Sequence, residues 1–230
     1  MHRRSSDQDG YGKAVQKSGN EDVSQTQPQR QTRSDRSANT REKILDGAYQ
    51  VLVKLGHAGL RSSNISQAAG VSRGGMLHHY PLKEELIAAL YLRLMDQLED
   101  ESSKIIDSTP DADLIDGIIA DGRQRFLGET YLAVLDILVA SSEEKLVAET
   151  LHRMPASDRV PARIRWMKRF EDAGVDPIIA SKITSLIWNA MKGLGIRNVV
   201  TPSDFHVDRV VSMAREIAMD VCGDDLKRAN

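Results

Sequence analysis

Hydrophobic residues return every three or four positions along most of the chain, as they do on one face of an α-helix. The first such stretch runs from Thr40, which we interpret as an N-cap, to Gly56. Its apolar positions are Ile44, Leu45, Ala48, Val51, Leu52 and Leu55. Two short stretches follow, and then a long one that starts near Leu82. The first half of the chain therefore predicts a helix, two short helices and a long helix.

The two short helices are bounded by residues that start or stop helices. Ser62 is expected to cap the first, and Gly70 to end it, because glycine adopts the left-handed conformation without strain. Ser72 is expected to begin the second helix. Tyr80 should end it, since the residue before a proline is pushed out of the helical region.

The second half has the same periodicity and lacks the alternation of a strand. Helices are predicted over residues 113–127, 129–141, 143–153, 159–173, 176–197 and 203–222. We therefore predict an all-α fold. The helix at 176–197 is apolar on nearly all sides, which indicates burial on more than one face. With the last helix it forms either half of a four-helix dimer interface or a purely internal pair.

The stretch ISQAAGVSRGGMLHHYPLKEELIAAL contains a short helix, a turn with glycine and a second short helix, which is the pattern of a helix-turn-helix. With AGVS in the turn and KEEL after the second helix, it resembles the DNA-binding domain of the TetR family of transcriptional repressors. The resemblance covers roughly Thr40 to Leu90. It implies a three-helix DNA-binding domain at 40–85, followed by a helical ligand-binding and dimerisation domain at 86–230. The implied partners are a double-stranded DNA operator, a second copy of the chain and a small-molecule effector that weakens DNA binding.

Residues for DNA contact follow from the resemblance and from a helical wheel. The resemblance implies that Thr40, Ser62 and Lys83 hold phosphates from helix N-termini, although the first two can equally be plain N-caps. On the wheel Met76 faces the core, so the opposite side of the second short helix faces the DNA groove. The predicted set is Thr40, Ser62, Ser63, Ser72, Arg73, Gly74, Gly75, Leu77, His78, His79 and Lys83.

The paired glycines in this helix need a reason, because each costs a helix interior ~1 kcal/mol relative to alanine. On the outward face they let the backbone approach bases or phosphates, or else they merely loosen the first turn. The family usually has threonine or alanine in place of Gly75 and tyrosine in place of Leu77, so the operator sequence cannot be inferred by analogy. His78 and His79 point ~100° apart and do not chelate one metal ion together; beside phosphates they are expected to become charged.

Residues 1–39 contain almost no bulky apolar side chains, which predicts a disordered tail. Its basic end, QPQRQTRSDRSANT, adjoins the first helix and either touches a DNA backbone or is inert. The segment 40–83 has six Lys/Arg against two Asp/Glu, whereas 84–230 has 18 against 26. A basic front on an acidic body favours a polyanion partner for the front.

Candidates for effector binding are the aromatic and polar residues of the second domain: Phe126, Tyr131, Asp136, Trp166, Phe170, Trp188 and Asn189. Asp136 interrupts the apolar run YLAVLDILVA, so its carboxylate needs a polar partner. That partner is either a group of the effector or a backbone or arginine neighbour. Aromatic residues at helical spacing are part of the core in most proteins, which is the alternative for the others.

The sequence lacks motifs that are typical of other classes of protein. The chain has no GxSxG, HExxH, P-loop or GxGxxG motif, so we expect no enzyme and no cofactor. No stretch is apolar enough to span a bilayer and no secretory signal is present, which predicts a cytoplasmic protein. The single cysteine, Cys222, offers neither an internal disulfide nor a zinc site. The remaining alternatives are a DNA-binding regulator controlled by a protein partner and an all-α enzyme.

Overall fold

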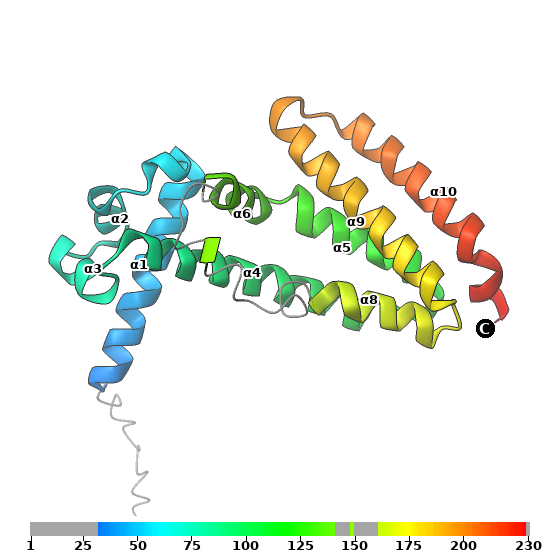
Figure 1. Cartoon of the computed structure of the whole chain (residues 1–230), viewed down its shortest axis with the longest axis horizontal. Coiled ribbons are helices and arrows are strands. Elements are labelled where there is room, and N and C mark those ends of the chain that lie inside the picture. The colour runs from blue at the N-terminus through cyan, green and yellow to red at the C-terminus, as the bar shows by residue number, and fades with distance from the viewer. Residues whose placement is uncertain (1–31, 141–147, 150–160, 229–230) are drawn as a thin grey trace, which may run out of the picture.

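The computed structural model describes residues 32–140, 148–149 and 161–228, and every regular element within these ranges is helical (Figure 1). The α-helices are α1 (Arg33–Leu55), α2 (Ser62–Ala69), α3 (Arg73–His79), α4 (Lys83–Ser108), α5 (Leu114–Leu127), α6 (Glu129–Ala140), α8 (Pro161–Asp172), α9 (Pro177–Val200) and α10 (Asp204–Arg228). Two 3-10 turns, η1 (His57–Gly59) and η2 (Asp111–Asp113), lie between them. The all-α class is confirmed, while most of the helix predicted at 143–153 lies outside the described residues.

Helix α1 begins earlier than predicted. The Thr32 hydroxyl accepts a hydrogen bond from the Asp35 backbone, and the Asp35 carboxylate accepts one from the Thr32 backbone, at 3.1 and 2.9 Å. This reciprocal capping box fixes the helix start in a polar stretch that has no apolar periodicity. The N-cap prediction for Thr40 is therefore wrong: its hydroxyl lies within the helix and donates to the Arg36 carbonyl at 2.8 Å. Residues 33–39, predicted as tail, are helical.

The helix-turn-helix forms where predicted, with one change of cap. Arg61 is the N-cap residue of α2 and Ser62 its first helical residue, so Ser62 does not cap the helix. Gly70 ends α2 with a φ of 64°, as expected. The Ser72 hydroxyl caps α3 by accepting from the Gly75 N–H at 3.0 Å. Helix α3 ends before Tyr80, as the following proline requires.

Two clusters of buried apolar side chains form the core. The first joins α1, α2 and α3 to the first half of α4 and, through Ala133, Val134 and Ile137, to α6. The second joins the end of α4 to α5, α8, α9 and α10. Helix α6 therefore packs against α1, η1 and α4 although it follows α5 in the chain. In Figure 1, α2 and α3 lie at one end of the molecule and α10 at the other.

Helices α5 and α9 pack so closely that glycine is needed on both. A Cβ on Gly195 would lie 2.1 Å from the Phe126 carbonyl oxygen, and one on Gly122 would lie 2.7 Å from Cγ of Met191. Both distances are too short for real contacts. At Gly195 the two backbones therefore approach without an intervening side chain, which fixes the position of Phe126 against α9, whereas the Met191 side chain packs on Gly122.

Candidate nucleic-acid interface and effector cavity

Helix α3 turns its small and polar side chains outward. Met76 and Tyr80 are 3% and 9% exposed and lie in the first core, which confirms the predicted inward face. Gly74, Leu77 and His78 are exposed. A Cβ on Gly74 would meet nothing within 4 Å, whereas one on Gly75 would lie 3.1 Å from the Ser72 hydroxyl that caps the helix. The outward face at Gly74 is thus flat backbone that another molecule can approach closely.

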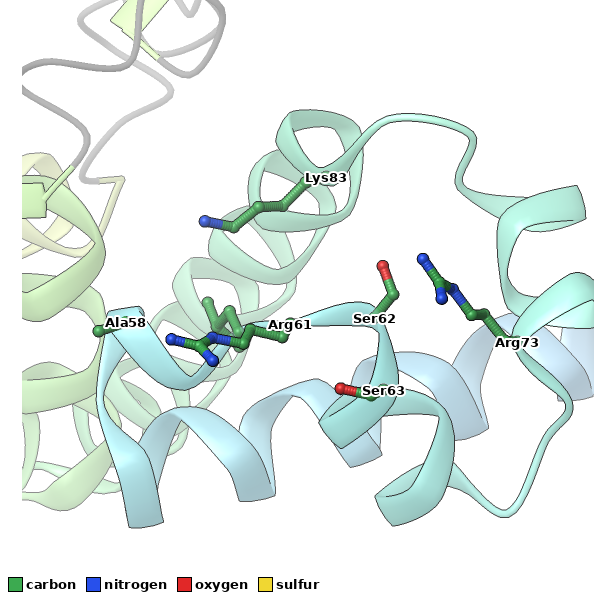
Figure 2. Close-up of a pocket in the computed structure, with 7 residues that line it drawn as sticks. Ala58, Arg61, Ser62, Ser63, Arg73 and Lys83 are labelled. Atoms are coloured by element: carbon green, nitrogen blue, oxygen red, sulfur yellow. The ribbon is translucent and has the colours of Figure 1, made fainter.

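A basic hollow of about 410 Å³ lies beside this face (Figure 2). It is lined by Ala58, Leu60, Arg61, Ser62, Ser63, Arg73 and Lys83. Figure 2 shows Arg73 reaching from α3 toward Ser62, with Lys83 arriving from the start of α4. Two helices begin here, at Ser62 and Lys83, and the first N–H groups of a helix favour an anion. Three cations, two hydroxyls and two helix N-termini suit the phosphates of a nucleic acid.

The sequence reasoning missed Arg61 and misplaced Thr40. Arg61 directly precedes the first residue of α2, and a basic residue just before a predicted helix start was the signal available. Thr40 lies well inside α1, so it has no helix N-terminus from which to hold a phosphate.

The two histidines stand at the end of α3, with ring centroids 5.5 Å apart. His78 is exposed and His79 half-buried. Burial lowers the pKa of His79, and the neighbouring charges of His78 and Arg41 lower it further. At a given pH a larger fraction of His79 is therefore neutral in the free protein than of an ordinary histidine.

A second cavity, of about 290 Å³, lies among α4, α5, α6 and α9. Its lining comprises Tyr91, Met95, Leu98, Arg125, Phe126, Tyr131, Val134, Leu138, Trp188 and Lys192. Three of the predicted effector residues meet here, because Phe126 contacts Tyr131 and Trp188 edge to face, with centroids 5.0 and 5.5 Å apart. Such aromatic pairs are favourable beyond their burial and form a rigid apolar wall.

The other four predicted effector residues lie elsewhere. Trp166 and Phe170 are fully buried in the second core. This agrees with the alternative that aromatic residues at helical spacing are part of the core. The Asp136 carboxylate accepts a hydrogen bond from the His57 backbone at 2.7 Å, so its partner is a backbone group of the chain itself. Asn189 is exposed on α9 and lines a separate surface hollow. These four do not line the cavity.

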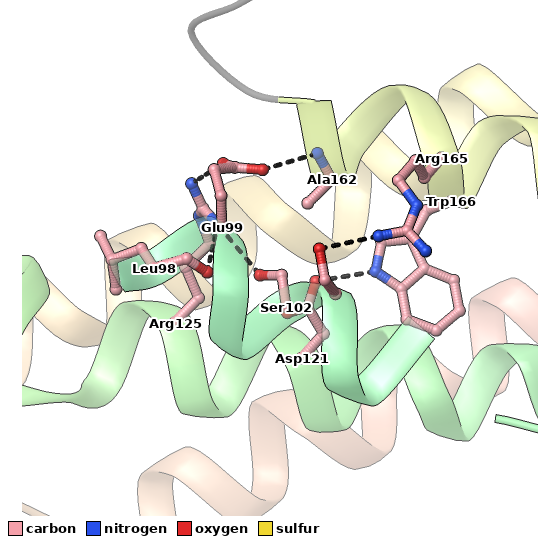
Figure 3. Close-up of polar contacts among 9 residues, drawn as sticks. Leu98, Glu99, Ser102, Asp121, Arg125, Ala162, Arg165 and Trp166 are labelled. Atoms are coloured by element: carbon pink, nitrogen blue, oxygen red, sulfur yellow. Dashed lines mark hydrogen bonds and ion pairs between the residues drawn. The ribbon is translucent and has the colours of Figure 1, made fainter. Parts of the chain in front are cut away.

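A buried polar network supports one wall of the cavity (Figure 3). Arg125 is 3% exposed; it donates to the Leu98 carbonyl and the Ser102 hydroxyl at 3.1 and 3.0 Å and pairs with Glu99. Glu99 also accepts from the Ala162 N–H at 2.8 Å. The positive charge of Arg125 is therefore matched within the chain, as a buried charge requires.

Next to this network the Trp166 indole donates to the Asp121 carboxylate at 2.7 Å (Figure 3). Burial raises the pKa of Asp121, while the bond from Trp166 and the charge of Arg125 act in the opposite direction. Trp166 thus satisfies one oxygen of a buried acid, which is a structural role, while the other oxygen, Oδ1, has no hydrogen-bond partner among the described residues.

Lys192 enters the same cavity from α9, and sequence reasoning missed it together with Arg125. Its ammonium lies 5.5 Å from the centroid of the Phe126 ring, in a cation–π arrangement. Burial lowers the pKa of Lys192, and the charges of Arg125 and Arg163 add to the effect. Charged residues on a mostly buried helix gave no signal in the sequence, because their aliphatic stems replace apolar side chains.

The outward faces of α9 and α10 carry exposed apolar side chains. On α9 these are Ile178, Leu186, Ile196, Val199 and Val200, and on α10 they are Phe205, Met213, Ile217, Met219 and Val221. Met213, Ile217 and Val221 follow each other at intervals of four and share one face of the helix. Leu194 and Val211, in contrast, pack against the second core.

Two other kinds of feature are absent from the described part of the chain. Of the helices at 32–140 and 161–228, none is long and apolar enough to cross a membrane. The described residues also hold no group of histidine, cysteine and acidic side chains suited to a metal ion.

Comparison with known proteins matches both halves of the chain. Residues 44–90 match the family model of bacterial regulatory proteins of the tetR family. The HTH-type transcriptional regulator CymR of Pseudomonas putida is 30% identical over 194 residues, which are 84% of this chain and 96% of CymR. The HTH-type transcriptional repressor AcnR of Corynebacterium efficiens is 38% identical over 56 residues, 24% of this chain and 30% of AcnR.

A solved structure shares the architecture. A TetR-family transcriptional regulator from Mesorhizobium loti, itself described as putative, superposes with a TM-score of 0.62 over 83% of this chain and 98% of its own, at 18% identity. This likeness extends the agreement in fold to the helices beyond α4.

Proposed function

The chain belongs to the TetR family of DNA-binding transcriptional regulators, and we propose that it is a homodimeric repressor that leaves its operator when a small molecule fills the cavity at Phe126, Tyr131 and Trp188. Its place of action is the cytoplasm, where its operator lies. The observation that carries the DNA-binding role is the basic hollow of Arg61, Arg73 and Lys83 beside the flat glycine face of α3.

In this proposal α3 lies in the major groove. Gly74 and Gly75 bring its backbone close to the bases, and Leu77 meets an apolar base edge such as a thymine methyl. Arg61, Ser62, Ser63, Ser72 and Lys83 hold phosphates on either side, and Arg73 reads a guanine edge or holds a phosphate.

The dimer interface in this proposal is the outer surface of α9 and α10. An exposed apolar stripe on α10 next to exposed apolar residues of α9 is a surface that two copies can cover together in a four-helix arrangement. Two copies would then present two recognition helices to a roughly palindromic site. Asn189, on the exposed face of α9, belongs to this surface in the proposal.

Repression and release by an effector have separate support. The name of the relative AcnR describes a repressor. Helix α6 forms one wall of the cavity among α4, α5, α6 and α9, and it packs against α1 and η1 in the DNA-binding part of the molecule. A ligand that spreads these helices would move α6. The first core cluster, which we call the DNA-binding core because it holds α1, α2 and α3 together, would move with it.

The test begins with duplexes selected from a random library by the full chain. Operator affinity is then measured at several salt concentrations for wild type, Arg61→Ala, Lys83→Ala and, as a matched control, Lys104→Ala at an exposed lysine near the end of α4. Each lost phosphate contact should make the slope of log affinity against log salt shallower by about 0.9, and the control should match wild type. Selection of no duplex, or slopes unchanged in both variants, would contradict the DNA-binding surface.

The alternative of a regulator without a small-molecule effector is tested with the same duplex. A panel of metabolites is added to the complex, and release is followed by fluorescence anisotropy. Release by a compound whose effect is lost on filling the cavity with Val134→Trp supports the effector, whereas release by no compound favours control by a protein partner. A reporter gene placed behind the selected site distinguishes repression from activation.

A further inference from the structure

We propose that the cavity takes a small aromatic carboxylate, with its ring among Phe126, Tyr131 and Trp188 and its carboxylate at Lys192. This inference rests on the proposed function, in which the same cavity holds the effector. It adds the chemical class of that effector.

The cavity contains a positive charge, on Lys192, that no described carboxylate matches. Among the described residues no carboxylate pairs with Lys192, whose charged neighbours Arg125 and Arg163 are both cations. The acid in the adjoining network, Glu99, already binds Arg125 and the Ala162 N–H. A half-buried ammonium without a counter-ion is costly, and an anionic ligand would supply the missing charge.

A buried hydrogen-bond donor lies on the same face of α9 as Lys192. The indole N–H of Trp188 has no acceptor among the described residues. Trp188 and Lys192 are four residues apart on α9, so their side chains leave the same side of the helix. A ligand with two acceptor oxygens can serve both donors. An alcohol offers one oxygen and no charge, and an ammonium would be repelled by Lys192 and Arg125.

The remainder of the cavity wall is apolar. Apart from Arg125 and Lys192 the lining is aliphatic or aromatic, and Phe126 stands edge to face with both Tyr131 and Trp188. A planar ring fits such a wall through the same edge-to-face contacts. The volume of about 290 Å³ lies at the lower end of the ~300–1,000 Å³ range of ligand sites, so the ligand is small. One unmatched cation also fits a singly charged carboxylate better than a doubly charged phosphate.

The inference is tested by calorimetry on the full chain. The probes are benzoate, phenylacetate and naphthalene-2-carboxylate, each compared with its primary amide, which has a similar shape without the charge. At least one carboxylate should bind about tenfold or more tightly than its amide, as a charge-assisted hydrogen bond implies. Acetate, which lacks the ring, should not bind measurably.

Variants of Lys192 locate the charge. Lys192→Met should bring the ratio of acid to amide affinity close to one and leave the amide affinity nearly unchanged, while Lys192→Arg should keep the preference. The control Lys104→Met, at an exposed lysine of α4 that does not line the cavity, should behave as wild type. Trp188→Phe, which keeps a ring and removes the N–H, should weaken the acid more than the amide. If Lys192→Met melts early, Lys192→Gln gives the same comparison.

Two results would overturn the inference: no carboxylate of the series binds better than its amide, or the preference persists in both uncharged variants of Lys192. Failure of the proposed function has a different signature. If a carboxylate binds through Lys192 but does not release the protein from the selected duplex, the proposed ligand class is supported. The proposed release from the operator is then contradicted.

Discussion

The backbone N–H of His57 donates a 2.7 Å hydrogen bond to Oδ2 of Asp136, a residue 79 positions away. The bond joins η1, which follows the first helix of the DNA-binding region, to α6, whose other residues Tyr131, Val134 and Leu138 line the cavity. The adjacent Gly56 has a φ of 66°, and a Cβ there would lie 3.4 Å from the same oxygen. A single carboxylate thus connects the wall of the cavity to the DNA-binding core.

Removing this carboxylate should weaken the connection. Asp136→Ala should lower the free energy of unfolding by about 1.5–3 kcal/mol, the range for hydrogen bonds to charged groups, and Asp136→Asn by less because its amide oxygen still accepts. Urea denaturation measures both. If the carboxylate also transmits ligand binding, Asp136→Ala should bind the ligand but show a smaller loss of operator affinity on its addition. Equal stability of the two variants would argue against the bond.

Gly74 offers a clean test of close docking by α3. Gly74→Ala places a methyl group in open space on the outward face, so it should raise stability by up to ~1 kcal/mol through helix propensity. Operator affinity should nevertheless fall, because the methyl group separates the backbone from the DNA. Urea denaturation and anisotropy titration measure the two effects. Unchanged affinity would mean that the glycine serves another purpose.

Substitution at Gly75 is expected to behave differently. The new Cβ lies 3.1 Å from the Ser72 hydroxyl, so Gly75→Leu disturbs the cap as well as the outward face. We therefore expect Gly75→Leu to lose both affinity and part of the ~1 kcal/mol that a helix cap contributes. Comparison with Gly74→Ala separates docking from capping.

The histidines of α3 should make DNA binding depend on pH. The pKa of His79 is lowered in the free protein, chiefly by burial, whereas a nearby phosphate favours the charged ring and raises its pKa in the complex. At any pH between these two pKa values, DNA binding is then accompanied by proton uptake. Operator affinity should rise as pH falls from 8 through the pKa of the complex, and level off below the pKa of the free protein.

The measurement compares wild type with the double variant His78→Gln, His79→Gln at fixed ionic strength. Glutamine keeps hydrogen bonding but does not titrate, so the variant should lose the rise at low pH. Its salt slope at pH 6 should also be shallower by about 0.9 for each charged contact removed. Identical pH profiles would assign these histidines to packing or to neutral base recognition.

A charge on the outer face of α10 should separate the proposed dimer. Ile217 is 46% exposed and lies in the middle of the apolar stripe, so Ile217→Glu would place an unpaired carboxylate in the interface. Light scattering at micromolar concentration should then show a monomer. Ile164→Glu makes the same change at an exposed isoleucine on α8 and should leave the dimer intact. A wild-type monomer, or a dimer in both variants, would contradict this interface.

The turn, the helix cap and the inward face of α3 were predicted from the sequence, because interactions between neighbouring residues determine them. Gly70 and Ser72 adopt the expected turn and cap, and Met76 faces the core as its spacing requires. The start of α1 was missed because the capping box of Thr32 and Asp35 lies outside any apolar repeat. Apolar periodicity signals burial, and a helix that begins in polar sequence gives no such signal.

The cavity shows the limit of such reasoning more clearly. Phe126, Tyr131 and Trp188 were candidates by residue type alone, and only tertiary packing brings them together and leaves Trp166 and Phe170 in the core. Arg125, on α5, gave no local signal because its position depends on contacts with α4. The partner of Asp136 is likewise set by folding, since no spacing in the chain relates it to His57.

The two sides of α6 have consequences for how this protein can change over generations. Tyr131 and Leu138 line the cavity, Ala133, Asp136 and Ile137 hold the helix against the DNA-binding core, and Val134 does both. In the effector site that we propose, selection for a new inducer can act on Tyr131 and Leu138 and leave the core contacts untouched. A laboratory that wants a biosensor for a different compound would therefore randomise those two positions and keep the existing output promoter.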